Sequence, residues 1–297
     1  MKRRDFLKNS ASMGAAFLLL KDVSVIPKSA GYDLVVAKNA EPEILVRQAV
    51  KELGGMNNFV NNGDIVVVKP NISWDRVPEQ AATTNPLLVS EVVKMCLEAG
   101  AKEVKIFDHT LNEARRCYKR SGIEKAASEA GADVKHVYSR KFKKVSIPEG
   151  ELVKSWEIYE DVLEADKIIN IPIAKHHNLC QVSLSMKNYM GFLGGRRGQL
   201  HRDFDIKLTD INTFIKADLI ILDSYRMLLR NGPSGGSLND VKLAKTVVCG
   251  TNPVAIDSYG ANLFGLDVNT IGFIKEASRR GLGIKDLQKL NIKHIEL

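Results

Sequence analysis

Short apolar runs rich in valine and isoleucine alternate with longer segments of helical periodicity along most of this chain. The runs are nearly continuous, which is typical of strands that are buried on both faces of a sheet. Polar or glycine-containing segments bound most of them, as is usual for strands. We therefore expect strands over residues 33–37, 64–69, 103–107, 133–137, 166–171, 218–222 and 246–249.

Between these runs, apolar residues recur at the spacing of one helix face. In the segment 86–99, Asn85 can cap the first turn, Pro86 suits that turn, and Gly100 can end the helix. We expect further helices over 42–53, 123–130, 206–216, 253–264 and 270–280. The alternation predicts an α/β fold with a mostly parallel sheet flanked by helices on both sides, either undivided or as two lobes with a cleft between them.

The first thirty residues have the features of an export signal. Arg3 and Arg4 precede a polar residue and Phe-Leu-Lys, as in twin-arginine signals, and a weakly apolar run follows over 11–20. Ten helical residues span roughly 15 Å, half of a ~30 Å membrane core, so we expect no stable transmembrane span. We predict a signal peptide over residues 1–30, the twin-arginine translocase as partner, and a periplasmic or extracellular location. Cleavage after Ala30, an uncleaved tether and an ordinary basic arm remain alternatives.

The length and charge of the remaining chain limit its class. Residues 31–297 suit a single α/β domain, with a candidate lobe boundary near 138–157. The net charge of +8 divides equally between residues 1–30 and the rest. This mild excess favours small acidic ligands, and the absence of a basic block interleaved with aromatic residues argues against nucleic acid. The four cysteines contain no Cys-x-x-Cys pair, so their spacing indicates neither a metal site nor a disulfide pairing.

Polar and ionisable residues lie where four predicted strands end. Because ligands of parallel α/β sheets bind at the carboxyl ends of the strands, we expect these residues to share one cleft. They are Lys69 and Asn71, Asp108 and His109, Lys175, His176 and His177, and Asp223. Ordinary solvated loops are the alternative interpretation.

A second candidate group lies within residues 183–203, where four glycines accompany basic side chains. Glycines allow backbone amides to converge on an anion, and arginine can donate two parallel hydrogen bonds to a carboxylate or phosphate. We expect Lys187, Asn188, Arg196 and Arg197 to bind the substrate together with Lys69, Asn71 and Lys175. A plain surface turn is the alternative, and the segment matches neither the dinucleotide fingerprint nor the phosphate loop.

The histidines suggest acid–base chemistry or a metal. His109 or His176 is a candidate general acid or base, with Asp108 to orient it, because histidine titrates near neutral pH. A divalent metal held by His177, His201, Asp223 and Asp257 is the other hypothesis. A structural role for each histidine is the third.

Several motifs together resemble the domain-of-unknown-function 362 family. They are Lys69-Pro70-Asn71, Thr83-Thr84-Asn85-Pro86, Lys175-His176-His177, Lys187-Asn188-Tyr-Met-Gly191, Gly232-Pro233-Ser-Gly235 and Asn252-Pro253-Val-Ala-Ile-Asp257, within residues 33–265. Many relatives are exported or carry a ferredoxin-like module with closely spaced cysteines. This chain contains no such motif, so the resemblance implies no iron–sulfur cluster here and leaves the reaction open.

Taken together, these patterns favour an exported enzyme that acts on a small carboxylate or phosphate, with or without a divalent metal. A non-catalytic periplasmic protein for anion binding or assembly is the second hypothesis. A partner subunit of a redox system is the third.

Overall fold

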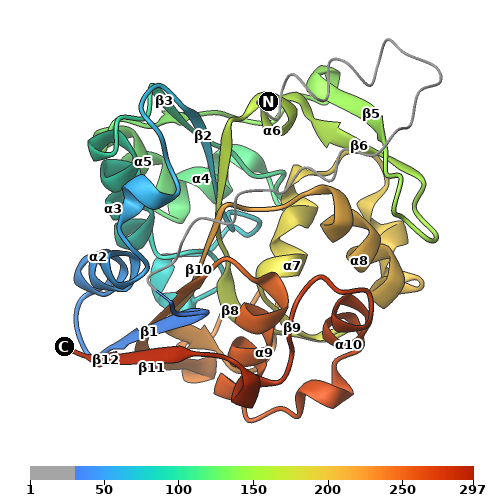
Figure 1. Cartoon of the computed structure of the whole chain (residues 1–297). Helices are drawn as coiled ribbons and strands as arrows, with labels where there is room; N and C mark the ends of the chain where they lie inside the picture. The colour runs from blue at the N-terminus through green and yellow to red at the C-terminus, as the bar shows by residue number, and fades with distance from the viewer. Residues whose placement is uncertain (1–30) are drawn as a thin grey trace.

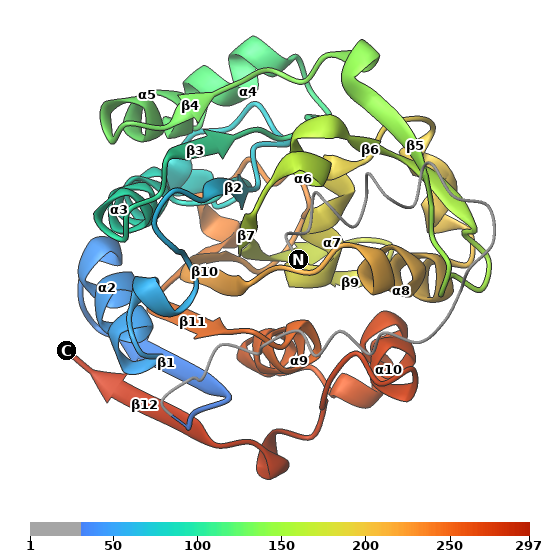
Figure 2. The ribbon, with the colours of Figure 1, turned by 45° about the horizontal axis from the view of Figure 1, so that its top comes forward.

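The computed structural model describes residues 31–297, so the predicted export signal over residues 1–30 lies outside the described residues. The described chain contains a mixed sheet in the order β12-β1-β11-β10-β7-β2-β3-β4, with β8 beside β10 and β9 beside β8 (Figure 2). Its strands are β1 (Leu34–Lys38), β2 (Ile65–Pro70), β3 (Glu103–Ile106), β4 (Asp133–Val134), β7 (Lys167–Ile171), β8 (Ile173–His177), β9 (Gln181–Ser183), β10 (Leu219–Leu228), β11 (Val241–Gly250) and β12 (Ile292–Glu296). Most neighbouring pairs are parallel, whereas β11 runs against both β1 and β10, and β9 runs against β8.

Helices cover both faces of this sheet (Figure 1). One face packs against α2 (Pro42–Glu52), α3 (Pro86–Glu98), α4 (Ala114–Arg120) and α5 (Ile123–Glu129). The other packs against α6 (Glu160–Glu164), α7 (Ser185–Asn188), α8 (Phe204–Phe214), α9 (Pro253–Leu263) and α10 (Gly272–Arg279). Successive strand side chains alternate between the two cores, as Val35 and Val36 do, which explains the uninterrupted apolar runs. The predicted α/β fold class is confirmed.

The helix ends follow the capping rules of the sequence. The side chain of Asn85 accepts a hydrogen bond from the amide of Leu87, and Pro86 begins α3. Asn252 likewise accepts from the amide of Ala255 before α9. These caps fix where two buried helices start, and with them the loops that precede each helix.

The seven predicted strands and six predicted helices all appear, although β4 has only two residues. The polar stretch near 138–157 contains most of an antiparallel hairpin, formed by β5 (Phe142–Ser146) and β6 (Ser155–Tyr159). This hairpin packs on the core beside α6. Three short helices and the strands β8, β9 and β12 were not foreseen; β8 and β12 contain lysine and histidine in place of a continuous apolar run.

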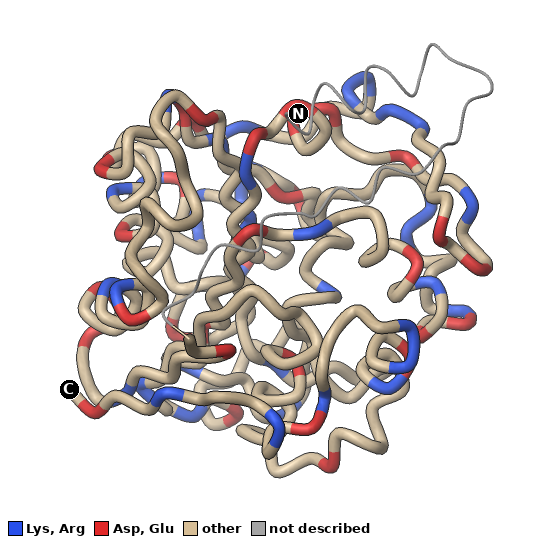
Figure 3. Tube along the Cα trace, in the orientation of Figure 1, with Lys and Arg blue, Asp and Glu red and all other residues tan. Residues whose placement is uncertain are grey.

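No helix among residues 31–297 is long and apolar enough to cross a membrane. All four cysteines are free thiols, and only Cys180 is more than slightly accessible to solvent. Basic and acidic residues are interspersed along the described trace (Figure 3).

Candidate functional site

The carboxyl ends of β2, β3 and β7 lie side by side, because β2 pairs in parallel with both neighbours. Lys69 occupies the penultimate position of β2, directly opposite Asn170 of β7. Asp108 follows β3 at the same end of the sheet. β8 continues from β7 after Pro172 and brings Lys175 to this edge. The fold thus places two lysines, one amide and a carboxylate where the strand-end rule expects a ligand.

Lys69 is fully buried and has three acceptors. Its Nζ lies 3.1 Å from Oδ1 of Asp108, 2.6 Å from the carbonyl oxygen of Pro70 and 3.4 Å from Oδ1 of Asn188. Burial lowers the pKa of Lys69, while the Asp108 carboxylate opposes that shift. The other oxygen of Asp108 accepts from the backbone amide of Ile72 and from the hydroxyl of Ser73. The ion pair therefore fastens the loop after β2 to the loop after β3.

Lys175 belongs to the same network through Asn71. Its Nζ donates to Oδ1 of Asn71 at 3.1 Å and to the carbonyl oxygen of Ala82 at 2.6 Å. Asn188 completes the connection, since its Oδ1 accepts from Asn71 and its Nδ2 donates to the carbonyl of Lys69. Lys69, Asn71, Asp108, Lys175 and Asn188 form one hydrogen-bonded unit, which we call the lysine–asparagine network.

Asn170 of β7, which the sequence analysis did not identify, is hydrogen-bonded to this network. Its side chain accepts from Nδ2 of Asn188 at 2.8 Å and donates to the carbonyl of Ser185 at 3.0 Å. Asn170 is fully buried and lies between isoleucines in β7. A lone amide in such a run needs a buried partner, and this signal could have identified it.

Gly191 brings the glycine-rich segment against the network. An added Cβ there would lie 1.9 Å from Oδ1 of Asp108 and 2.7 Å from Nζ of Lys69, so only glycine fits. Arg197 then reaches back and donates to the backbone carbonyls of His109, Thr110 and Met190. Arg196 instead points into solvent. The two adjacent arginines therefore have different environments, and Arg197 is the one beside the network.

Lys187 on α7 is a partly buried cation without a carboxylate partner among residues 31–297. Its Nζ lies 5.9 Å above the ring of Phe204. Burial lowers the pKa of Lys187, and the positive charge of Arg197 adds to that effect. Lys187 in turn lowers the pKa values of Lys175, His177 and His201, which places all of them within its electrostatic range. This part of the site has an excess of positive charge.

The hydrogen bonds of the histidines define their tautomers. Nδ1 of His109 lies 2.7 Å from the carbonyl of Leu193, so Nδ1 carries the proton and Nε2 keeps a lone pair in the neutral ring. Nδ1 of His176 accepts from the amide of Gly232, and Nδ1 of His177 from that of Leu179. In their neutral rings Nε2 carries the proton. Burial lowers the pKa of His109 and also lowers that of His177, to about 3, so both are neutral at pH 7.

The four candidate metal ligands do not converge. His177 and His201 stack with ring centroids 5.9 Å apart, whereas Asp223 and Asp257 accept backbone hydrogen bonds elsewhere. Asp223 holds the amides of Asn85 and Tyr225, and Asp257 holds those of Ser185 and Met186 at the start of α7. Within residues 31–297 no three His, Cys, Asp or Glu side chains gather in a way that could hold a metal ion.

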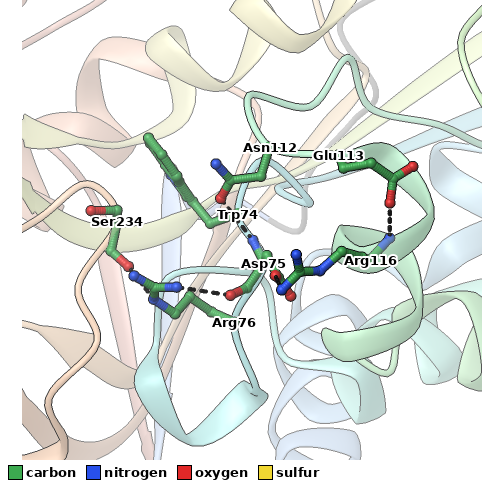
Figure 4. A pocket seen from close by; sticks show the side chains of 7 residues that line it. All are labelled: Trp74, Asp75, Arg76, Asn112, Glu113, Arg116 and Ser234. Atoms are coloured by element: carbon green, nitrogen blue, oxygen red, sulfur yellow. Dashed lines mark hydrogen bonds and ion pairs between the residues drawn. The ribbon is translucent and has the colours of Figure 1, made fainter.

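A pocket of about 440 Å³ opens beside the network, between the loops that follow β2, β3 and β10 (Figure 4). It is lined by Trp74, Asp75, Arg76, Asn112, Glu113, Arg116 and Ser234. Arg76 donates to the carbonyls of Asp75 and Ser234, and Arg116 forms an ion pair with Asp75. These contacts join the loops around the pocket. Ser73 connects the pocket to the network. Its backbone carbonyl accepts a hydrogen bond from the amide of Asn112, and its hydroxyl donates to Asp108.

The residues 66–262 match the family model described as Domain of unknown function (DUF362). The chain belongs to the DUF362 family. The matched region contains the whole lysine–asparagine network, Lys187 and Arg197. A relative is the thylakoid-associated protein sll1697 of Synechocystis sp., 26% identical over 245 residues, which are 80% of this chain and 74% of that protein.

Two solved structures are distantly similar to this member of the DUF362 family. The lactate racemase apoprotein from Thermoanaerobacterium thermosaccharolyticum is 13% identical with a TM-score of 0.47, over 88% of this chain and 61% of that one. A Thermotoga maritima protein is 11% identical with a TM-score of 0.39, over 80% of this chain and 58% of that one. The chain thus spans less than two thirds of either structure, and at these scores neither informs the chemistry of the site.

Proposed function

We propose that this DUF362 protein is an enzyme that binds a small carboxylate or phosphate at the lysine–asparagine network and acts on it by acid–base chemistry. The observation that carries the proposal is the charge balance of the site. Lys69, Lys175, Lys187 and Arg197 lie within electrostatic range of one another in pairs, and among residues 31–297 Asp108 is the one carboxylate paired with any of them. A bound anion would compensate the positive charge of Lys187 and Arg197.

The side chains divide into roles. Lys187 and Arg197 bind the anion through their positive charges, since neither is paired with a carboxylate in the part of the chain that the structure describes. His109 is the general base, because its Nε2 lone pair is free in the neutral ring. His177 offers an N–H donor from Nε2, because its Nδ1 already accepts the amide of Leu179. Lys69 and Asp108 hold the two loops that carry these groups.

Non-catalytic anion binding is the second candidate. It is favoured by His176, whose Nδ1 is occupied by the amide of Gly232, so this histidine cannot serve as a base in its neutral form. A binding protein needs only the cationic lining. Turnover of any small acid that binds would decide for the enzyme.

Titration calorimetry of the full chain with phosphate and with small dicarboxylates tests the proposal. We expect saturable binding by the wild type and a loss of about 1.5–3 kcal/mol, roughly tenfold or more in affinity, for Lys187→Met. Arg196→Met is the matched control, because Arg196 is exposed and should change binding little. Absence of saturable binding by the wild type, or equal losses in both variants, would contradict the proposal.

We further propose that residues 1–30 direct export by the twin-arginine translocase to the periplasm or the extracellular space. The support is the Arg3-Arg4 pair followed by Phe-Leu-Lys and a short apolar run. Arg3→Lys combined with Arg4→Lys keeps the charge and should leave the precursor in the cytoplasm. Normal export of this double variant, measured by cell fractionation, would refute the targeting role.

A further inference from the structure

The pocket of about 440 Å³ is lined by no residue of the lysine–asparagine network and by none to which the proposed function assigns a role. Its volume lies within the range of small-molecule sites, which is roughly 300–1,000 Å³, and far exceeds the ~30 Å³ that one water molecule occupies in the liquid. An ion of only a few atoms would leave most of this space to water. The size of the pocket therefore favours a larger organic ligand.

The walls of the pocket are held by contacts between loops. The carbonyl of Ser73 accepts from the amide of Asn112 at 3.2 Å, which joins the loop after β2 to the loop after β3. Nε of Arg76 donates to the carbonyl of Ser234 at 3.0 Å, which joins the loop after β2 to the segment after β10. The contacts of the chain itself thus shape the pocket, and such preorganisation lowers the entropic cost of binding.

The two carboxylates of the pocket are already engaged. The oxygens of Glu113 accept the backbone amides of Arg115 and Arg116. The carboxylate of Asp75 forms ion pairs with Arg116 at 2.5 Å and with Arg120 at 3.5 Å. Neither carboxylate is therefore available to neutralise the one other cation among the lining residues, Arg76.

Arg76 has only neutral acceptors. Its Nε, Nη1 and Nη2 donate to the backbone carbonyls of Ser234, Asp75 and Gly235, respectively. Three of its five N–H bonds are engaged in this way, and no carboxylate within residues 31–297 pairs with it. Two N–H bonds remain, and a guanidinium group binds carboxylate or phosphate oxygens strongly through such donors. Arg76 is thus suited to hold an anionic group.

Trp74 supplies a flat apolar wall. It is the one aromatic residue among the seven that line the pocket, and it is partly exposed. Its ring lies between Asn112 and Ser234 in Figure 4. Aromatic rings favour a second ring, stacked or edge-on, with the centroids about 4.5–7 Å apart. The pocket therefore combines a surface for a planar ring with a cation that has no anionic partner in the described chain.

We infer that this pocket binds a small acid with a planar aromatic ring, whose anionic group pairs with Arg76 while its ring packs on Trp74. The inference goes beyond the proposed function, since it assigns a second ligand site that has residues of its own. Binding is non-covalent and requires no other reactant.

Fluorescence of the full chain tests this site, because Trp74 and Trp156 are its two tryptophans. Trp156→Phe leaves Trp74 as the single tryptophan emitter. The probes are benzoate and cyclohexanecarboxylate, which have the same charge and similar size, whereas only benzoate has a planar π system. We expect a saturable change in Trp74 emission with benzoate, and an affinity about two- to tenfold lower for cyclohexanecarboxylate.

Substitutions in the same Trp156→Phe background locate the acid. Arg76→Met should weaken benzoate binding at least tenfold, because it removes a charged hydrogen-bond donor. Lys119→Met is the matched control, since it removes an exposed charge of α4 outside the pocket and should leave the affinity unchanged. Lys187→Met should also leave benzoate binding unchanged, which separates this site from the anion site of the proposed function.

The comparison of the two acids needs no change in the pocket, so it decides even where Arg76→Met does not fold. Absence of a saturable response to benzoate, or an unchanged affinity in Arg76→Met, overturns the inference. Equal affinities for the two acids would overturn the role of Trp74. A loss in Lys187→Met as large as that in Arg76→Met would place the acid at Lys187 and overturn the second site. Phosphate binding that depends on Lys187, in a chain that does not bind benzoate, would leave the proposed function standing alone.

Discussion

The buried ion pair between Lys69 and Asp108 makes a quantitative prediction. At 3.1 Å and an effective dielectric constant of about 20, two unit charges attract by about 5 kcal/mol. Removal of one partner leaves the other buried without compensation, which costs about 3–5 kcal/mol. We therefore expect Lys69→Met and Asp108→Asn each to lower the free energy of unfolding by about that amount.

The double variant distinguishes the loss of a charge interaction from the loss of ordinary side-chain packing. Because neither charge remains, Lys69→Met combined with Asp108→Asn should be more stable than the sum of the single effects predicts, by about 2–3 kcal/mol. The assay is equilibrium urea unfolding of all four proteins under the same conditions. The exposed pair Lys125–Glu129, with Nζ and Oε1 3.9 Å apart, is the matched control and should give a coupling of about 0.5 kcal/mol or less. Additivity within about 0.5 kcal/mol at Lys69 and Asp108 would refute the argument that these groups form a compensated buried pair.

Two further changes test the packing and the electrostatics of the site. Gly191→Ala places a Cβ against Asp108 and Lys69 and should lower the free energy of unfolding by more than about 2 kcal/mol. In the control Gly198→Ala, the added Cβ meets nothing within 4 Å, and the free energy of unfolding should change by no more than about 0.5 kcal/mol. Equal unfolding midpoints for the two variants would contradict the close approach at Gly191. The folded pKa of His177, about 3, lies below its ordinary value of 6.5, so stability present above pH 6.5 should be lost as the pH falls toward 3. His177→Gln should reduce the loss of folding stability between pH 6.5 and pH 4 by about 2 kcal/mol, after solvent screening is allowed for. An unchanged pH profile of unfolding would argue against a neutral buried ring.

The sequence was sufficient for the fold class because burial on both faces gives strands that are easy to identify. The run Ile65–Val68 and the helix that begins at Pro86 are examples, since composition and capping residues mark them locally. The strand-end rule placed eight residues in one cleft, and the structure joins four of them, Lys69, Asn71, Asp108 and Lys175, in one network. These residues share an edge by topology alone, so no knowledge of loop geometry was needed.

Loop geometry explains what could not be foreseen. Arg196 and Arg197 are equivalent in sequence, and only the path of the chain after Gly195 decides that Arg197 faces inward. Asp223 and Asp257 look like metal ligands in sequence, but nearby amides occupy their oxygens. The tautomers of the histidines depend on backbone partners many residues away, such as Leu193 for His109 and Gly232 for His176. No spacing rule contains this information.

The position of β1 has a consequence for the order of events during protein synthesis. This strand, the first of the described chain, pairs with β11 on one side and β12 on the other, and both lie near the far end of the sequence. While the ribosome is still making the middle of the chain, β1 has neither of these partners. Its sheet can close only after residues 241–250 and 292–296 have emerged, and such long-range pairing is slow. We expect the sheet around β1 to close only after residue 296 has been made, so that until then the growing chain keeps an unpaired apolar strand.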